Sequence, residues 1–90
     1  MGTEARTRLT TLASMGLIHL ERRESAYNRM RFYNIVVTPT LFGGWALVRE
    51  WGRIGQPGTV RETWFESENA AIEAGTQVRQ QKERRGYLLV

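Results

Sequence analysis

A tryptophan and an arginine two positions apart, Trp51 and Arg53, are the residues whose types and spacing best suit binding chemistry. Side chains two apart on an extended strand project from one face, so a ring and a guanidinium would lie side by side. An aromatic ring that stacks on a sugar or base, beside a cation, is how many proteins bind single strands and strand ends. Gly52 between them permits close approach of a backbone. The structural alternative makes Trp51 a core residue and pairs Arg53 with a glutamate, either Glu50, Glu62 or Glu66.

The inventory of reactive side chains argues against catalysis. The 90 residues include no cysteine, no aspartate and one histidine, His19, which we expect to be a hydrogen-bonded structural residue. Without cysteine there are no thiol nucleophiles or thiolate ligands, and without aspartate there are no Ser–His–Asp or aspartate-held magnesium sites. The sequence therefore predicts a protein that is not an enzyme and that holds neither a metal nor a cofactor. Absence of cysteine also fits the reducing cytoplasm, where we expect the protein to act.

The charge balance points to an anionic partner. The chain has 13 lysines and arginines against 9 acidic residues, a net charge of +4, and Lys82 is the single lysine. Arginine suits phosphate and stacks on aromatic rings, so a small arginine-rich domain is a candidate for nucleic-acid binding. Arginine-rich codon usage in a high-GC genome would explain the same composition. Arg22-Arg23 with Arg29 and Arg31 is either a basic patch across a hairpin or a solvated face.

Residue patterns predict an α+β fold of order β-β-β-β-α-β, a single antiparallel β-sheet with one long helix packed across one face. Strands are expected where β-branched and aromatic runs are bounded by glycine or proline, over 17–23, 29–38, 45–54, 59–65 and 87–90. Ser67 as N-cap and Gly86 after the last turn bracket a helix over about 68–85. Small residues form its inner stripe and allow close packing: Ala71, Ala74, Gly75 and Val78.

These elements position the candidate residues. Arg49 shares a strand face with Trp51 and Arg53, whereas Trp45 and Trp64 are expected to pack in the core or on the sheet. Residues 1–16 are predicted to be a flexible or loosely docked N-terminal arm, and 17–90 the domain. No apolar run approaches the ~20 residues that cross a membrane, so no membrane association is expected. The unpaired edges of the sheet could pair with a second copy, so the sequence is compatible with a homodimer.

Trp51-Gly52-Arg53 with Ile54-Gly55 resembles the signature of the WGR domain family, which is named for that tripeptide. Further features follow the family's order: Arg31 before Phe32-Tyr33, Leu41-Phe42-Gly43-Gly44-Trp45, Phe65-Glu66-Ser67 before a helix with Ala70-Ala71, and Arg85-Gly86-Tyr87. The resemblance covers about residues 17–90 and is greatest to stand-alone bacterial members. The tripeptide alone would be weak evidence, but five matched features in order are strong evidence.

The resemblance implies roles for particular residues. In DNA-dependent poly(ADP-ribose) polymerases the WGR domain helps recognise DNA ends, and its tryptophan packs on the sugar of a terminal nucleotide. The matching residue is Trp51, and Arg53 matches an arginine that contacts DNA or neighbouring domains. Arg31 matches a basic residue, typically lysine, that approaches the DNA backbone. With Gly52 and Arg49, these form the expected nucleic-acid-binding set.

The leading hypothesis is a non-catalytic module that binds DNA or RNA, recognising DNA ends, nicks or single-stranded stretches. Low sequence specificity is expected, because no recognition helix carries base-reading side chains. The alternative is a protein–protein interaction module that docks on a DNA-repair or nucleic-acid-processing enzyme, through the Trp51–Arg53 face or a strand edge. A basic surface with interleaved aromatic rings around Trp51 would favour the first hypothesis. An apolar surface there would favour the second.

Overall fold

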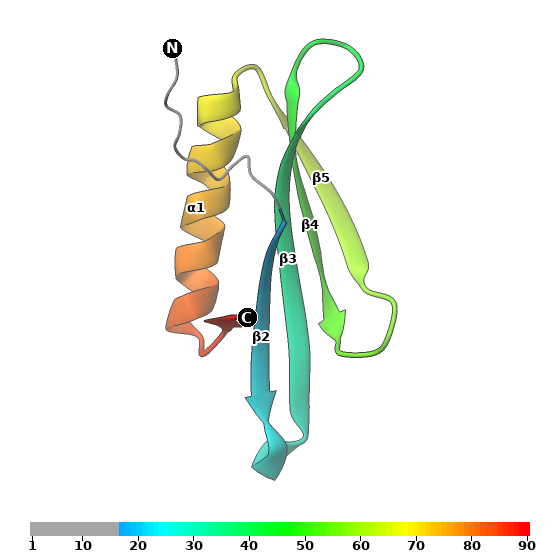
Figure 1. The fold of residues 1–90 in the computed structure, drawn as a ribbon, viewed down its shortest axis with the longest axis vertical. Coiled ribbons are helices and arrows are strands. Elements are labelled where there is room, and N and C mark those ends of the chain that lie inside the picture. The colour runs from blue at the N-terminus through cyan, green and yellow to red at the C-terminus, as the bar shows by residue number, and fades with distance from the viewer. Residues whose placement is uncertain (1–16) are drawn as a thin grey trace.

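Alternation of apolar and polar residues along the strands gives an antiparallel sheet with one face suited to a helix (Figure 1). The structure is a computed structural model, and it describes residues 17–90; the predicted arm, 1–16, lies outside them. The sheet has five strands in the order β5-β4-β3-β2-β6. The elements are β2 Ile18–Glu24, β3 Arg29–Pro39, β4 Trp45–Arg53, β5 Thr59–Phe65, α1 Glu68–Arg84 and β6 Leu88–Leu89. The predicted α+β class and the order β-β-β-β-α-β are confirmed.

The helix packs on the sheet through its small residues, as predicted. Ala71 and Gly75 are buried, and a Cβ added at Gly75 would lie 3.2 Å from Leu47 Cδ1. The Ser67 hydroxyl accepts a hydrogen bond from the Ala70 backbone N–H at 3.1 Å, which satisfies one of the free amides of the first turn. At the other end Gly86 has φ +95°, the left-handed conformation that ends many helices. The chain can therefore turn back and add β6 beside β2.

The core lies between the helix and the sheet face that we call the helix-side face. Its buried members are Leu20, Tyr33, Ile35 and Leu47, and Trp51, Phe65, Val78 and Tyr87 are among the half-buried residues that pack against them. We call the other surface of the sheet the open face. The β2–β3 hairpin extends beyond the C-terminal end of α1, so part of the helix-side face there is not covered by the helix (Figure 1).

The loop between β3 and β4 is held by hydrogen bonds at its base. The Thr40 hydroxyl accepts hydrogen bonds from the backbone N–H groups of Phe42 and Gly44, and the Thr40 N–H donates to the Gly44 carbonyl at 2.9 Å. Gly43 at the tip has φ +89°. The loop therefore presents Leu41 and Phe42 from a fixed base. Within residues 17–90, no helix is long and apolar enough to cross a membrane.

Candidate nucleic-acid interface

Two neighbouring cross-strand rows build the candidate interface where the helix ends. One row consists of Leu20, Tyr33 and Trp51, on β2, β3 and β4. The next row on the same face consists of Arg22, Arg31 and Arg53. Directly opposed residues in antiparallel strands point to the same face. The register therefore sets three arginines side by side, immediately beyond an apolar row that ends in Trp51.

Trp51 is half-buried and rests on a buried ring. Its ring stacks on that of Tyr33, with centroids 5.6 Å apart and planes 11° from parallel. Tyr33 is 4% exposed and meets the edge of the Tyr87 ring at 6.2 Å. The structural alternative for Trp51 therefore holds in part, because the side chain packs against the core. Its exposed part leaves the contact with nucleic acid a prediction.

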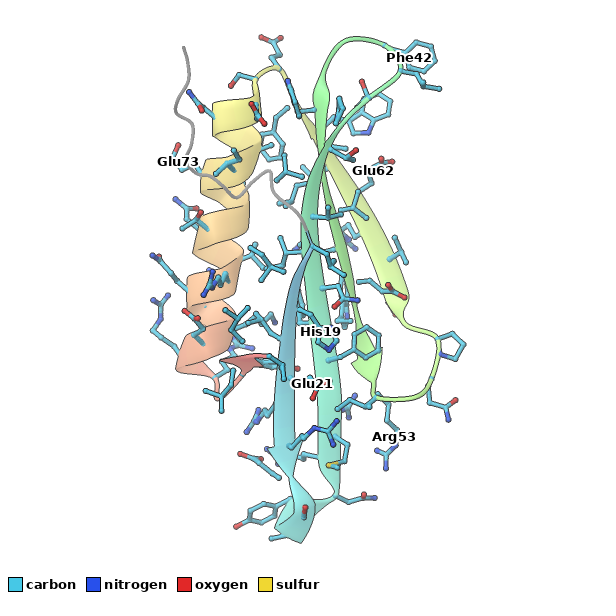
Figure 2. The ribbon with its side chains drawn as sticks, viewed as in Figure 1. His19, Glu21, Phe42, Arg53, Glu62 and Glu73 are labelled. Carbon is cyan, nitrogen blue, oxygen red and sulfur yellow. The ribbon has the colours of Figure 1, made fainter. Side chains whose placement is uncertain are left out.

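Arg53 on β4 and Arg31 on β3 are directly opposed cross-strand partners, and both side chains are exposed. Arg53 Nη2 donates a hydrogen bond to Asn28 Oδ1 at 3.2 Å, and Figure 2 shows the Arg53 side chain directed outward at the lower end of the sheet. Arg53 does not take part in the ion pairs found within residues 17–90, so the glutamate pairing of the structural alternative is not observed there. Its guanidinium is held near the end of the β2–β3 hairpin by a neutral partner.

Two further cations lie against the aromatic pair. The Arg49 guanidinium carbon lies 5.9 Å from the centroid of the Trp51 ring, and Lys82 Nζ lies 4.7 Å from that of Tyr33, both cation–π distances. Burial, followed by the charges of Arg85 and Arg49, lowers the pKa of Lys82. Arg49 Nε is buried without a hydrogen-bond partner in the described part of the chain. A bound anion would relieve the repulsion between these cations.

Gly52 has a packing role on the open face. A Cβ there would lie 3.1 Å from Gly58 Cα and 3.5 Å from Phe32 Cε1, so a side chain would crowd the turn after β4. The glycine lets that turn fold back over the strand. Its contact with nucleic acid stays a prediction.

The open face around the single histidine has different chemistry. His19 Nδ1 is hydrogen-bonded to Asn34 Oδ1, and His19 Nε2 lies 2.8 Å from Glu21 Oε2. The hydrogen bond to Glu21, followed by that to Asn34, raises the pKa of His19. The expected structural role of His19 is therefore confirmed. An adjacent cleft is lined by Glu21 and Glu50, carboxylates that would repel phosphate.

Three residues of the interface were not expected from sequence, namely Tyr33, Lys82 and Tyr87. Tyr33 and Trp51 each lie nine positions from Phe42 at the tip of the β3–β4 loop. Residues at equal distances from the tip of a hairpin oppose each other, so this count predicts that Tyr33 and Trp51 are cross-strand partners. The sequence explains Lys82 mainly as a cation in the last helical turn, where it suits the helix dipole, and offers a phosphate contact as the less favoured alternative. The expectation for Trp64 is wrong, because its side chain is 66% exposed, whereas Trp45 is half-buried.

Comparison with known proteins gives a family match and a similar protein. The family model of the WGR domain matches residues 17–89. The chain is 36% identical over 70 residues to an uncharacterized protein, y4dW, of Sinorhizobium fredii (strain NBRC 101917 / NGR234). The alignment covers 78% of this chain and 34% of that protein, so the chain spans about a third of the relative's length. No solved structure matches the chain.

Proposed function

The chain belongs to the WGR domain family, and from that premise we propose that it is a non-catalytic module that binds DNA ends and nicks. The observation that carries the proposal is the stacked Trp51 ring with cations around it. We call this surface the cationic end, and it consists of Trp51, Arg31, Arg49, Arg53 and Lys82. None of these four cations is ion-paired with a carboxylate of residues 17–90. Their charge is therefore available to phosphates.

The rigidity of Trp51 supports recognition of a terminus. An uninterrupted duplex offers its phosphates to a protein surface but keeps its nucleosides stacked on both sides. An end or a nick exposes one face of the terminal nucleoside, and the solvent-exposed part of Trp51 would stack against it. Tyr33 fixes the ring before DNA arrives, so little freedom is lost on binding. A base–aromatic stack of this kind contributes about 1–3 kcal/mol.

The surroundings of Trp51 favour nucleic acid over a protein partner at this surface. Tyr33 and Arg49 lie against the ring, Lys82 and Tyr87 lie against Tyr33, and Arg31 and Arg53 form the next row. A basic surface with interleaved aromatic rings is what the first hypothesis requires. A protein docking on the Trp51–Arg53 face would have to neutralise the same charges. Arg31 and Arg53 would contact phosphates on either side of the terminus, whatever its sequence.

Competition between circular DNAs tests the proposal. The wild-type protein is bound to a fluorescent nicked duplex, and two unlabelled competitors are added, a covalently closed circle and the same circle carrying one nick. We expect the nicked circle to compete more strongly, because only it offers a terminal nucleoside. Affinity should also fall with salt, at about −0.9 in log–log slope for each neutralised phosphate. Equal competition by both circles would contradict end recognition, and negligible or salt-independent binding would contradict the whole proposal.

A further inference from the structure

The end of the molecule opposite the cationic end carries an exposed aromatic surface. Figure 2 shows Phe42 at one end of the long axis and Arg53 toward the other, with the β2–β3 hairpin reaching beyond it. Leu41 is 96% exposed, Phe42 88% and Trp64 66%. Single exposed apolar side chains are common, but a contiguous apolar group on a small domain usually marks an interaction site. We call this surface the aromatic end, and it consists of Leu41, Phe42, Trp45, Trp64 and Phe65.

The aromatic end contains a cleft large enough for a side chain. Its volume is about 480 Å³, and its walls include Phe42, Trp45, Trp64 and Phe65. The β3–β4 loop that forms one wall is fixed by Thr40, and a Cβ at Gly44 would lie 3.1 Å from the Phe65 carbonyl oxygen. The loop is thus packed tightly on the end of β5. The cleft is preformed, which reduces the ordering cost of binding.

The charge at this end has the opposite sign to that of the cationic end. Segments 36–48 and 62–75 contain four glutamates and no lysine or arginine. Of the 13 basic residues, Arg6 and Arg8 precede the described residues and the other 11 lie outside these two segments. Glu66 lines the cleft itself, and Glu62 is on the same strand as Trp64 and points to the same face. The two ends are therefore built for ligands of opposite charge.

We propose that the aromatic end binds a basic segment of a partner protein, which inserts an apolar side chain into the cleft. Nucleic acid does not suit this surface, because the glutamates would repel its phosphates. In a symmetric dimer through this surface, Glu62 and Glu66 of one copy would face the same glutamates of the other copy, and the like charges would repel. An apolar side chain flanked by lysine or arginine suits this surface, because the apolar side chain fills the aromatic cleft and the basic side chains contact the glutamates beside it. The module would then join a protein at one end to a DNA terminus at the other.

Selection from a displayed library of random peptides tests the proposal with a defined probe. The full chain is the target, and excess Trp64→Ala variant in solution removes peptides that bind elsewhere. Trp64 is mostly exposed, so that variant is expected to fold. Enriched peptides should carry an aliphatic or aromatic residue flanked by lysine or arginine. No enrichment, or enrichment of acidic peptides, would overturn the proposal.

The indole N–H signals of the three tryptophans then locate binding by nuclear magnetic resonance. A selected peptide should shift the signals of Trp45 and Trp64, whereas nicked DNA should shift that of Trp51. This readout separates the two proposals. If nicked DNA does not shift the Trp51 signal, the peptide can still be tested at Trp45 and Trp64. If no peptide shifts those two signals, DNA binding can still be tested at Trp51. A peptide that shifts only Trp51 would overturn the aromatic end as its docking site.

Matched variants give the remaining controls. Trp64→Ala should weaken the peptide's affinity at least about tenfold, as expected for a central aromatic anchor. Glu62→Gln should weaken it several-fold, whereas Glu73→Gln, on the outer side of α1, should not (Figure 2). Arg53→Ala should leave peptide binding unchanged. Peptide affinity insensitive to Trp64→Ala, or a dimer in light scattering that Trp64→Ala dissociates, would overturn the proposed occupant.

Discussion

Tyr33 and Trp51 face each other across β3 and β4, and their rings stack with centroids 5.6 Å apart. Tyr33 is 4% exposed and belongs to the buried core, whereas Trp51 is half-buried. The core residue therefore acts as the support for the residue that we assign to DNA. The fold and the proposed interface are coupled through this contact.

Removing the Tyr33 ring should lower the stability of the fold. Tyr33→Ala takes a large buried ring out of the core and should lower the free energy of unfolding by about 3–5 kcal/mol. Tyr33→Phe keeps the stack and should stay within about 0.5 kcal/mol of wild type. Urea denaturation followed by circular dichroism measures both. Equal stability of the alanine variant and wild type would contradict the place of Tyr33 in the core.

The contact between α1 and the sheet should not tolerate added volume. Ala71 is 0% exposed, so Ala71→Leu should overpack the contact and destabilise the protein by about 1–3 kcal/mol. Thr76→Leu, on the exposed side of the same helix, adds an apolar side chain to solvent and serves as the control. If thermal or urea unfolding placed both variants at wild-type stability, the observed packing of the helix would be contradicted.

The His19 network predicts a defined pH dependence. The hydrogen bonds to Glu21 and Asn34 raise the pKa of folded His19 above its ordinary value of about 6.5. The stability that this histidine contributes is therefore complete below about pH 6.5, and is lost as the pH rises through the raised pKa. Glu21→Gln removes the main cause and should lower the His19 pKa.

A proton titration of the single imidazole by nuclear magnetic resonance checks this. Glu24→Gln is the control, because Glu24 pairs with Arg22 and Arg29 and does not contact His19. Its His19 pKa should match that of wild type. A wild-type pKa at or below the ordinary histidine value would show that the network does not form in solution.

The order of elements could be predicted because local signals agreed with the tertiary structure. Ser67 and Gly86 mark the ends of the helix by capping chemistry, and alternation placed Trp51 and Arg53 on one face. The exposure of Trp64 could not be predicted. Its aromatic type is typical of a buried strand, but Trp64 opposes Ala46 of β4 and lies on the open face of the edge strand β5, which α1 does not cover. Burial depends on which neighbour covers a face, and composition does not carry that information.

The candidate site was predictable only in part for a related reason. The family tripeptide identified Trp51 and Arg53, but Lys82 comes from the helix and meets Tyr33 only through tertiary packing. A lysine in a last helical turn is explained locally by the dipole, so nothing in its immediate sequence marks it as part of the interface. Arg49 was placed on the right face by alternation, and its contact with Trp51 required the folded strand.

Arg31 should contact a DNA phosphate and contribute equally to the binding of every form of duplex DNA. Arg31→Ala should weaken binding to nicked, blunt and uninterrupted duplex alike and reduce the magnitude of the log–log salt slope by about one. Arg23→Ala removes the same charge from the open face, where Arg23 pairs with Glu21, and serves as the matched control. Salt titrations by fluorescence anisotropy compare them. An unchanged salt slope for Arg31→Ala would remove Arg31 from the interface.

The affinity of Trp51→Ala for nicked and for covalently closed circular DNA tests the central claim most directly. The variant must first be shown to fold, and Trp64→Ala at the opposite end is the control for loss of a tryptophan. We predict that Trp51→Ala loses about 1–3 kcal/mol of binding to the nicked circle, the size of one stack, and almost none to the closed circle. Trp64→Ala should bind both circles as wild type does. A folded Trp51→Ala variant that binds nicked DNA as tightly as wild type would contradict the account and leave Trp51 a packing residue.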